Sequence, residues 1–510
     1  MNIIKRFFGY GDLILQSYKI RKADSEEKRE TAYKKLTESM GKLHGLPQKV
    51  GQLMSMSSQA SSQHFKDLEN NSNEMPFNKI KDILKKTWGK NIEDVLENIS
   101  EKANAASLGQ VHRATLKDGR DVAIKVQYPN IRDHLETEIT TMSWLANIKG
   151  NSKIKFDTDI YKNEFLRDLN EELDYRHEAN LQTQFSIITS ALPEIIVPQV
   201  INELSSETVL VSEWQDGKSL DDIALQWSDE DKQQSAMLLM KLFCHSLFET
   251  GFLHADPHQG NYRFRKNGEN IEIILYDFGS VFQCTQDFRL TLMKLIKAST
   301  QLEDVDPYRL MLKLGFDKDL LKPLIPKLPA ICSILFEPFE SPMKFDHSQW
   351  NRVERISDVL QDDRWNFRMS GPPNFIFLIR AFHGILSQLT TLNKIVSWKI
   401  PLAPYLQQYQ KEIDNLTLPN TQEESKTFDS IAKYLVILVE KNGKKKAEIK
   451  LPAKRIDDIT DLMEEEVLNK IVQRGIDIDA KVKAIRANGY IPQNIVTLEE
   501  EDSTIYVSLE

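Results

Sequence analysis

The stretch of sequence that decides the fold is FLHADPHQGN, residues 252–261, which is followed by ILYDFGS, residues 274–280. Enzymes that transfer phosphoryl groups with kinase geometry place an aspartate that orients the nucleophile at a fixed spacing before a magnesium-binding asparagine, and Asp256 and Asn261 have that spacing. Asp277, followed by Phe and Gly, stands where a second metal-binding carboxylate is needed. The two stretches predict Asp256 as a catalytic residue, with Asn261 and Asp277 as the metal ligands.

A zinc site is the alternative interpretation of the same stretch. His254 and His258 could share one face of a helix, as the paired histidines of zinc hydrolases do. Pro257 disfavours helical backbone at Asp256, and Ala255 stands where those enzymes carry a glutamate. The sequence therefore favours the phosphoryl-transfer loop over the zinc site.

Upstream segments supply the remaining charged groups of such a site. The strand-like VAIK ends in Lys125, and EELDYRHEAN, residues 171–180, contains Glu178 as the acidic partner expected on a helix. Each match alone is weak, but their joint occurrence in the correct chain order is strong. A transferring phosphate carries concentrated negative charge, so one lysine and a metal held opposite it are the groups that this chemistry needs.

Two further segments are predicted to contact the nucleotide. No G-x-G-x-x-G precedes Lys125; alanines replace glycines in KANAASLGQVHRA, residues 102–114, and they disfavour positive φ, which predicts a stiffer loop. VSEWQDG, residues 211–217, stands where backbone groups around Glu213 and Trp214 would hold the base, although an ordinary strand end remains an alternative there. The predicted loop contacts are Ala105, Ala106, Ser107, Gly109, Gln110 and Val111.

Composition narrows the class of protein. With 510 residues, 41% hydrophobic and 28% charged, the chain is globular and has several domains. The net charge of −9 argues against a nucleic-acid partner, and three scattered cysteines predict neither a thiolate zinc site nor disulfides. No run of apolar residues reaches membrane-spanning length, so we expect a cytoplasmic protein. Its first twenty or so residues form an amphipathic segment that either packs on the protein or lies on a membrane surface.

The order of elements predicts four parts. Apolar periodicity indicates helices up to about residue 100 and again over much of 131–190 and the region after Gly217. Strands are predicted over 110–116, 121–128, 194–201, 207–214 and 271–279, with a hairpin at 434–451 and a β-like segment at 494–509. The predicted parts are a helical extension over 1–100, an N-lobe over 101–217, a C-lobe over 218–417 and a small α+β module over 428–510.

These motifs resemble the UbiB/AarF family of atypical protein-kinase-like proteins across most of residues 40–385. LPQKVGQLMSM resembles its K-x-G-Q motif at Lys49, NAASLGQVH its alanine-rich loop, and EELD its E-x-D motif at Glu172 and Asp174. GPPNFIFLIRAFHG, residues 371–384, is similar to a C-lobe helix with a central arginine, here Arg380. Gln259 departs from the family, which usually has proline there. Membrane-spanning helices, which family members often carry at their C-terminus, are not predicted.

The resemblance implies an α+β, bilobal protein-kinase-like fold with a helical N-terminal extension and a small α+β C-terminal module. It implies that Lys49 approaches Glu172 and Asp174 where a protein substrate would lie, whereas the sequence alone suggests an exposed helix lysine. It also implies ATP or ADP with Mg²⁺ as cofactors, and ATP hydrolysis that supports ubiquinone or prenyl-lipid metabolism. A kinase acting on a protein or small lipid, and a nucleotide-gated lipid-binding scaffold with negligible turnover, remain the alternatives.

Overall fold

The computed structural model describes most of the chain after residue 74. The described residues are 75–106, 108–129, 131, 173–256, 258–301, 305–340, 342–420, 432, 434–441, 444–460, 463, 465–487, 492–499 and 503–510. They form parts of two compact units. The first consists of Met1–Ser246, Phe252–Phe282 and Ile376–Lys394, and the second of Leu247–Gly251, Gln283–Phe375 and Ile395–Glu510. The four-part division predicted from the sequence stays a prediction.

A five-stranded antiparallel sheet begins the first unit. Its order is β1-β3-β4-β6, with β2 paired to β3. The strands are β1 (Leu96–Ile99), β2 (Asn104–Ala105), β3 (Gly109–Leu116), β4 (Asp121–Gln127) and β6 (Val209–Glu213). The predicted strands at 110–116, 121–128 and 207–214 are confirmed. The described end of the region predicted to be helical contains α5 (Phe77–Trp88) and α6 (Ile92–Val95), but also β1. Residues 96–99 extend because β1 pairs with the end of β3, a contact that local periodicity does not contain.

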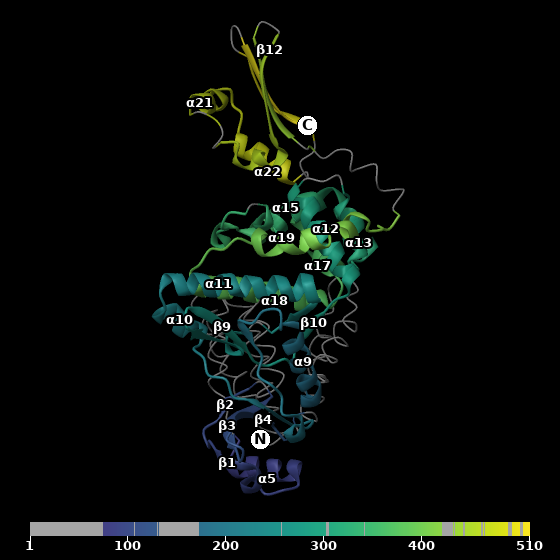
Figure 1. Cartoon of the computed structure of the whole chain (residues 1–510). Helices are drawn as coiled ribbons and strands as arrows, with labels where there is room; N and C mark the ends of the chain where they lie inside the picture. The colour runs from purple at the N-terminus through teal and green to yellow at the C-terminus, as the bar shows by residue number, and fades with distance from the viewer. Residues whose placement is uncertain are drawn as a thin grey trace, which may run out of the picture. The chain divides into compact units, whose positions relative to one another are not determined.

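Buried and partly exposed side chains alternate along β4, so the two faces of the sheet differ. Val122, Ile124 and Val126 are fully buried in one cluster with Ile80 and Leu84 of α5, and α5 is drawn beside these strands in Figure 1. The intervening side chains point to the opposite face, because successive strand residues alternate. Burying the apolar face against α5 therefore leaves the other face to line a pocket.

The segment after α9 (Tyr175–Ile188) corrects one predicted strand. Residues 194–201 were expected to be extended throughout, but β5 covers only Ile195–Ile196, which pairs in parallel with β9. Pro198 lacks a backbone N–H, so it interrupts ladder formation, and Val200 makes only an isolated bridge to Ser212.

The remainder of the first unit surrounds the loop between β7 and β8. Its elements are α10 (Leu220–Gln226), α11 (Asp229–Cys244), the π-helix His245–Thr250 that continues into the second unit, β7 (Phe252–His254), η4 (Gln259–Asn261), β8 (Tyr262–Asn267), β9 (Asn270–Leu275), β10 (Val281–Gln283) and α18 (Phe375–Leu392). β8 and β9 pair in an antiparallel hairpin, and β10 pairs with β7. α11 and α18 lie side by side, as Figure 1 shows, and line one small cavity together.

Helix α18 corrects the expectation about membrane-spanning segments. Within the described residues it is the one helix long and apolar enough to cross a membrane by length and composition. This helix contains no unbroken apolar run, because Arg380, His383 and Gln388 interrupt its sequence. Ala381, Ile385 and Gln388 are buried where α18 meets α11, which is the behaviour of a core helix.

The second unit combines helices with a separate antiparallel sheet. Its helices are α12 (Gln286–Gln301), α13 (Pro307–Lys313), α14 (Lys318–Leu321), α15 (Leu328–Phe336), α16 (Arg352–Leu360), α17 (Arg364–Ser370), α19 (Lys399–Gln408), α20 (Gln410–Asp414), α21 (Glu465–Gln473) and α22 (Ile478–Ala487). The four-stranded sheet has the order β12-β11-β14-β13. Its strands are β11 (Tyr434–Lys441), β12 (Lys444–Pro452), β13 (Gln493–Glu499) and β14 (Ser503–Leu509). The hairpin predicted at 434–451 is confirmed, and the segment predicted as β-like at 494–509 contains two paired strands.

Candidate nucleotide site

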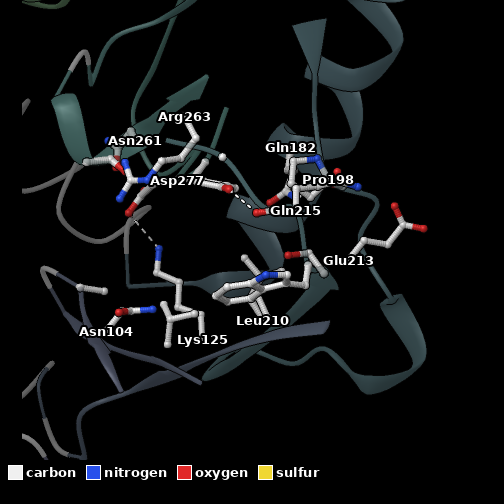
Figure 2. A pocket seen from close by; sticks show the side chains of 18 of the residues that line it. Asn104, Lys125, Gln182, Pro198, Leu210, Glu213, Gln215, Asn261, Arg263 and Asp277 are labelled. Atoms are coloured by element: carbon white, nitrogen blue, oxygen red, sulfur yellow. Dashed lines mark hydrogen bonds and ion pairs between the residues drawn. The ribbon is translucent and has the colours of Figure 1, made fainter. Parts of the chain in front are cut away.

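A pocket of about 410 Å³ lies in the first unit, between the open face of the five-stranded sheet and the loop that follows β7. This volume is within the range of small-molecule sites. Nine of the residues predicted from the sequence line it: Ala106, Val111, Lys125, Glu178, Glu213, Trp214, Asp256, Asn261 and Asp277. Figure 2 shows Lys125, Asn261 and Asp277 converging on the same space. Residues from six separate segments of the chain thus meet at one cavity.

Lys125 is the centre of a charged cluster in this pocket. Its Nζ lies 2.7 Å from Oε1 and 2.9 Å from Oε2 of Glu178, and 3.1 Å from Oδ2 of Asp277. Strand β4 presents the lysine because position 125 alternates with the buried Val126 and Ile124. The first turn of α9 presents Glu178, whose side chain is only 2% exposed. One ammonium is therefore held between two carboxylates.

Burial and mutual charge interactions shift the pKa values of the three residues in this cluster. Burial lowers the pKa of Lys125, but the charges of Asp277 and Glu178 outweigh that effect and leave the pKa raised. Burial raises the pKa of Glu178 from its ordinary 4.5 to about 7, against the opposing charge of Lys125. For Asp277, burial is outweighed by Lys125, and the pKa is lowered. Because the two carboxylates share one cation, the lysine and Asp277 stay charged, and Glu178 is the carboxyl that takes up a proton most readily.

Asp256 is held from two sides. Asn261 Nδ2 donates to Asp256 Oδ2 at 2.9 Å and to its backbone carbonyl at 3.1 Å. Arg380 Nη2 donates to the other carboxylate oxygen, Oδ1, at 3.2 Å, and the arginine side chain is 11% exposed. The sequence suggested Arg380 only as the centre of a helix, so its contact with Asp256 is information from the tertiary structure. An amide and a guanidinium fix the orientation of the carboxylate and favour its charged form.

His254 shapes the backbone around Asp277. Its Nε2 lies 2.8 Å from the carbonyl oxygen of Asp277 and 3.2 Å from that of Tyr276. Asp277 has a φ of 54°, which is unusual for a residue other than glycine, and its Oδ1 accepts from the N–H of Gly279 at 3.2 Å. Phe278 is fully buried and packs against His254, with ring centroids 5.3 Å apart. The neighbouring segments thus hold Asp277 in a conformation that its own sequence does not favour.

The alanine-rich loop is only partly as predicted. Ala106 and Val111 line the pocket, together with Asn104, which sequence reasoning missed. Gln110 is a correction, because its side chain is 1% exposed and its Oε1 accepts from the N–H of Met75 at 2.7 Å. It lies on the face of β3 opposite Val111, as strand alternation requires.

The remaining residues predicted in this loop are placed less directly. A Cβ on Gly109 would lie 2.3 Å from the carbonyl oxygen of Val126, so glycine is needed for the close approach of β3 to β4. Ala105 belongs to β2 and pairs with Gln110, and Ser107 lies outside the described residues.

The strand end at Glu213 and Trp214 lines the pocket, but the backbone N–H groups of both residues already donate hydrogen bonds within the protein. The N–H of Glu213 donates to the carbonyl of Gln199, and that of Trp214 to the carbonyl of Asp121, each at 2.9 Å. The next residue, Gln215, also lines the pocket and was missed by the sequence analysis. Its side chain, one position beyond the predicted end of the strand, gave no signal of its own in the sequence. The N–H groups of Glu213 and Trp214 are therefore not free to bind a ligand.

Of the three residues predicted for the N-terminal arrangement, only Asp174 belongs to the described part of the chain. Lys49 and Glu172 lie outside the described residues. Asp174 is described and acts as the N-cap of α9, where its carboxylate accepts from the N–H of Arg176 at 3.0 Å. The proposed approach of Lys49 to the two acidic residues stays a prediction.

The donor set fits a magnesium ion bound together with a nucleotide. In the described ranges no three His, Cys, Asp or Glu side chains are grouped as a self-sufficient metal site. Mg²⁺ at phosphate-transfer sites needs only one or two carboxylates, since substrate phosphates and water supply the other ligands. Asp277 and Asn261 are the oxygen donors placed to hold it.

Comparisons with known proteins agree with this geometry. Residues 67–307 match the model of a family described as the ABC1 atypical kinase-like domain. The AarF domain-containing protein kinase 1 of Xenopus laevis is 34% identical over 227 residues, 44% of this chain and 44% of that protein. Atypical kinase coq-8, mitochondrial, of Caenorhabditis elegans is 28% identical over 273 residues, 52% of this chain and 36% of that protein.

A solved structure extends the likeness to the fold. Rv3197 from Mycobacterium tuberculosis, solved in complex with erythromycin, superposes with a TM-score of 0.53 at 25% identity, covering 74% of this chain and 95% of that one. With the family match, this likeness establishes the predicted protein-kinase-like fold of mixed helices and sheets. The chain spans less than half the length of the two relatives named above, so their activities are not transferred to it by similarity alone.

Proposed function

We propose that this protein is an atypical kinase-like, magnesium-dependent ATPase, because residues 67–307 match the model of the ABC1 atypical kinase-like domain. The observation that carries the proposal is the joint placement of two charged clusters in one pocket. Lys125 contacts both Glu178 and Asp277, and Asp256 is held by Asn261 across the same cavity. A pocket for a lipid or peptide alone has no need of this complete set.

Each residue has a task that its position supports. Lys125 presents a positive charge to the phosphates, and Glu178 keeps the lysine in place. Asp277 and Asn261 hold Mg²⁺, which neutralises the charge that develops on the transferring phosphoryl group. Asp256 orients a water molecule, whose oxygen forms the new bond to the terminal phosphorus as the bond to the bridging oxygen breaks. Because Asn261 and Arg380 stabilise its charged form, Asp256 acts mainly by orientation.

The physiological setting and acceptor belong to the same proposal. Support for ubiquinone or prenyl-lipid metabolism comes from the family resemblance and from the coq-8 name of one relative, not from a described residue. A kinase acting on a protein or small lipid would use the same five residues. The acceptor is the only difference: a substrate hydroxyl would replace water in front of Asp256.

The test is turnover of ATP labelled at the γ-position, measured with and without liposomes that contain a prenyl lipid. Release of labelled phosphate that needs Mg²⁺ and is lost in Asp256→Asn supports the ATPase. Transfer of label to added protein or lipid would instead assign the kinase. Binding of MgATP without either product, in a correctly folded protein, would contradict both and leave the lipid-binding scaffold.

A further inference from the structure

Position 259 begins the short helical turn that carries part of the proposed active site. The turn is η4 (Gln259–Asn261), and its N-cap is His258, whose Nδ1 accepts from the N–H of Gly260 at 3.0 Å. Proline suits the first position of a helical turn, because its ring fixes φ and it has no N–H to satisfy. Glutamine lacks this restriction, so the backbone gains no rigidity from the residue at this position.

The side chain of Gln259 instead reaches a distant helix. Its Nε2 donates to Oγ1 of Thr391 in α18 at 3.1 Å, a partly buried hydrogen bond between residues 132 positions apart. The neighbouring Thr390 is exposed, and its Oγ1 donates to the carbonyl of Leu386 within the same helix. Of these two threonines, Thr391 is therefore the one that connects α18 to η4.

Helix α18 also holds the other end of this loop. Arg380 donates to Oδ1 of Asp256 at 3.2 Å. Arg380 and Thr391 are eleven positions apart, close to three turns of about 3.6 residues each, so they lie on one face of the helix. The same face of α18 therefore contacts the loop at Asp256 and again at Gln259.

The two ends of the loop carry residues of the proposed catalytic set. Asn261 Nδ2 donates to Asp256 Oδ2 at 2.9 Å, so a shift of η4 would move the metal ligand relative to the carboxylate that orients the nucleophile. Arg263 Nη1 holds the backbone of the turn through the carbonyl oxygens of Gln259 and Gly260, at 3.3 and 3.0 Å. Arg263 belongs to the next strand, whereas the side chain of Gln259 provides a link to α18.

We propose that Gln259 is a positioning residue for phosphoryl transfer, which fixes η4 against α18 through its hydrogen bond to Thr391. The inference rests on the proposed ATPase activity. Gln259 is not one of the described residues that line the pocket, so it acts through its neighbours Asp256 and Asn261. Proline should be able to replace this glutamine. His258 has φ −58° and ψ 136°, the extended conformation that proline requires of the preceding residue, and a fixed φ would make the turn independent of Thr391.

The experiment is a double-mutant cycle on the full chain, with kcat for MgATP hydrolysis and hydrogen exchange of the loop without nucleotide as the readouts. Thr391→Val removes the hydroxyl and should lower kcat by about threefold to tenfold while leaving KM within about twofold. It should also speed hydrogen exchange in the segment 258–262. In the Gln259→Pro background, the same substitution should change kcat by less than about twofold.

Two matched variants separate the hydrogen bond from general damage to α18. Thr391→Ser keeps the hydroxyl and should retain kcat within about twofold. Thr390→Val makes the same change at the exposed neighbouring position and should alter neither kcat nor loop exchange. If Gln259→Pro does not fold, Gln259→Leu replaces it. That variant alone should match Thr391→Val, and the double variant should lose no more than either single one.

Each other outcome overturns a specific statement. A wild-type protein that hydrolyses ATP but tolerates Thr391→Val in both kcat and loop exchange contradicts the positioning role and leaves the proposed function intact. Equal losses from Thr391→Val in the wild-type and Gln259→Pro backgrounds would show that Thr391 acts independently of Gln259, which also contradicts the inference. A wild type with neither ATP turnover nor transfer of label contradicts the proposed function and the positioning role together, even if loop exchange confirms the contact.

Discussion

The two sheets of this protein carry lysines in opposite surroundings. In β4 of the first unit, Lys125 is 12% exposed and contacts two carboxylates. In β12 of the second unit, residues 445–450 are all exposed, and Lys445 and Lys450 form ion pairs with Glu448, at 2.6 and 4.0 Å. Both strands form antiparallel backbone hydrogen bonds with their neighbours. The difference lies in what covers the face, because a buried ion pair fixes geometry whereas an exposed one contributes little to stability. Both sheets carry lysines, but only the sheet that lines the pocket holds one in a buried ion pair among the residues compared.

The largest effect is expected at Asp277. Asp277→Asn should reduce ATP turnover by about a hundredfold to a thousandfold, because it removes the carboxylate that holds the metal. It should also abolish the stabilisation by MgATP, about 2.7 kcal/mol at 100 times the dissociation constant. Turnover and thermal shift are the measurements. Lys450→Ala, which removes an exposed lysine from β12, is the control, and an Asp277→Asn protein with unchanged turnover would make the proposed site wrong.

Removal of the buried lysine should affect stability as well as binding. Lys125→Ala leaves Glu178 and Asp277 facing each other without a cation, and we expect a loss of about 3 kcal/mol in the free energy of unfolding without ligand. Urea denaturation of Lys125→Ala and Lys450→Ala compares the two sheets directly. Equal, small losses in the two variants would contradict the distinction drawn between them.

The raised pKa of Glu178 predicts that the free energy of unfolding depends on pH. The pKa of Glu178 is raised in the folded state to about 7, so its contribution to stability is complete below its unfolded value of about 4.5 and is lost as pH rises through about 7. A shift of this size corresponds to about 3 kcal/mol. Unfolding free energies between pH 4.5 and 7.5 should fall less steeply with pH in Glu178→Gln. A variant with the wild-type slope would exclude Glu178 as the titrating group.

Arg380 provides a second buried ion pair in the first unit and a separate test. Arg380→Gln should lower kcat by about tenfold to a hundredfold while leaving the affinity for MgATP within about threefold, because it loosens Asp256 without touching the phosphate ligands. Single-turnover kinetics and nucleotide titration separate these effects. Arg380→Lys should restore part of kcat. Loss of MgATP affinity in step with kcat would indicate a general structural role instead.

The smallest effect is expected in the exposed sheet. Glu448→Gln removes the ion-pair partner of Lys445 and Lys450, yet the midpoint of urea denaturation should not change measurably, since both lysines remain solvated. Turnover should be unchanged. A loss comparable to that of Lys125→Ala would show that exposure is a poor guide to the importance of these pairs.

Local sequence patterns predicted those elements that depend mainly on strand alternation and turn residues. The hairpin at 434–451 and the strands around Lys125 follow from alternation and turn residues, and both are present. The strand expected at 194–201 was shortened by Pro198, and β1 was missed because its pairing partner is distant in sequence. Gln110 was assigned to the pocket from its motif, although the alternation of β3 places it on the opposite face.

By itself the sequence identified Lys125, Glu178, Asp256, Asn261 and Asp277, because phosphoryl transfer needs those residue types in that chain order. Tertiary structure alone decided which further groups meet them. Arg380 reaches Asp256 across 124 positions, and Gln182 and Ser212 line the same pocket as Lys125. These contacts depend on how α9, α18 and β6 pack, and packing joins residues whose separation along the chain carries no periodic signal.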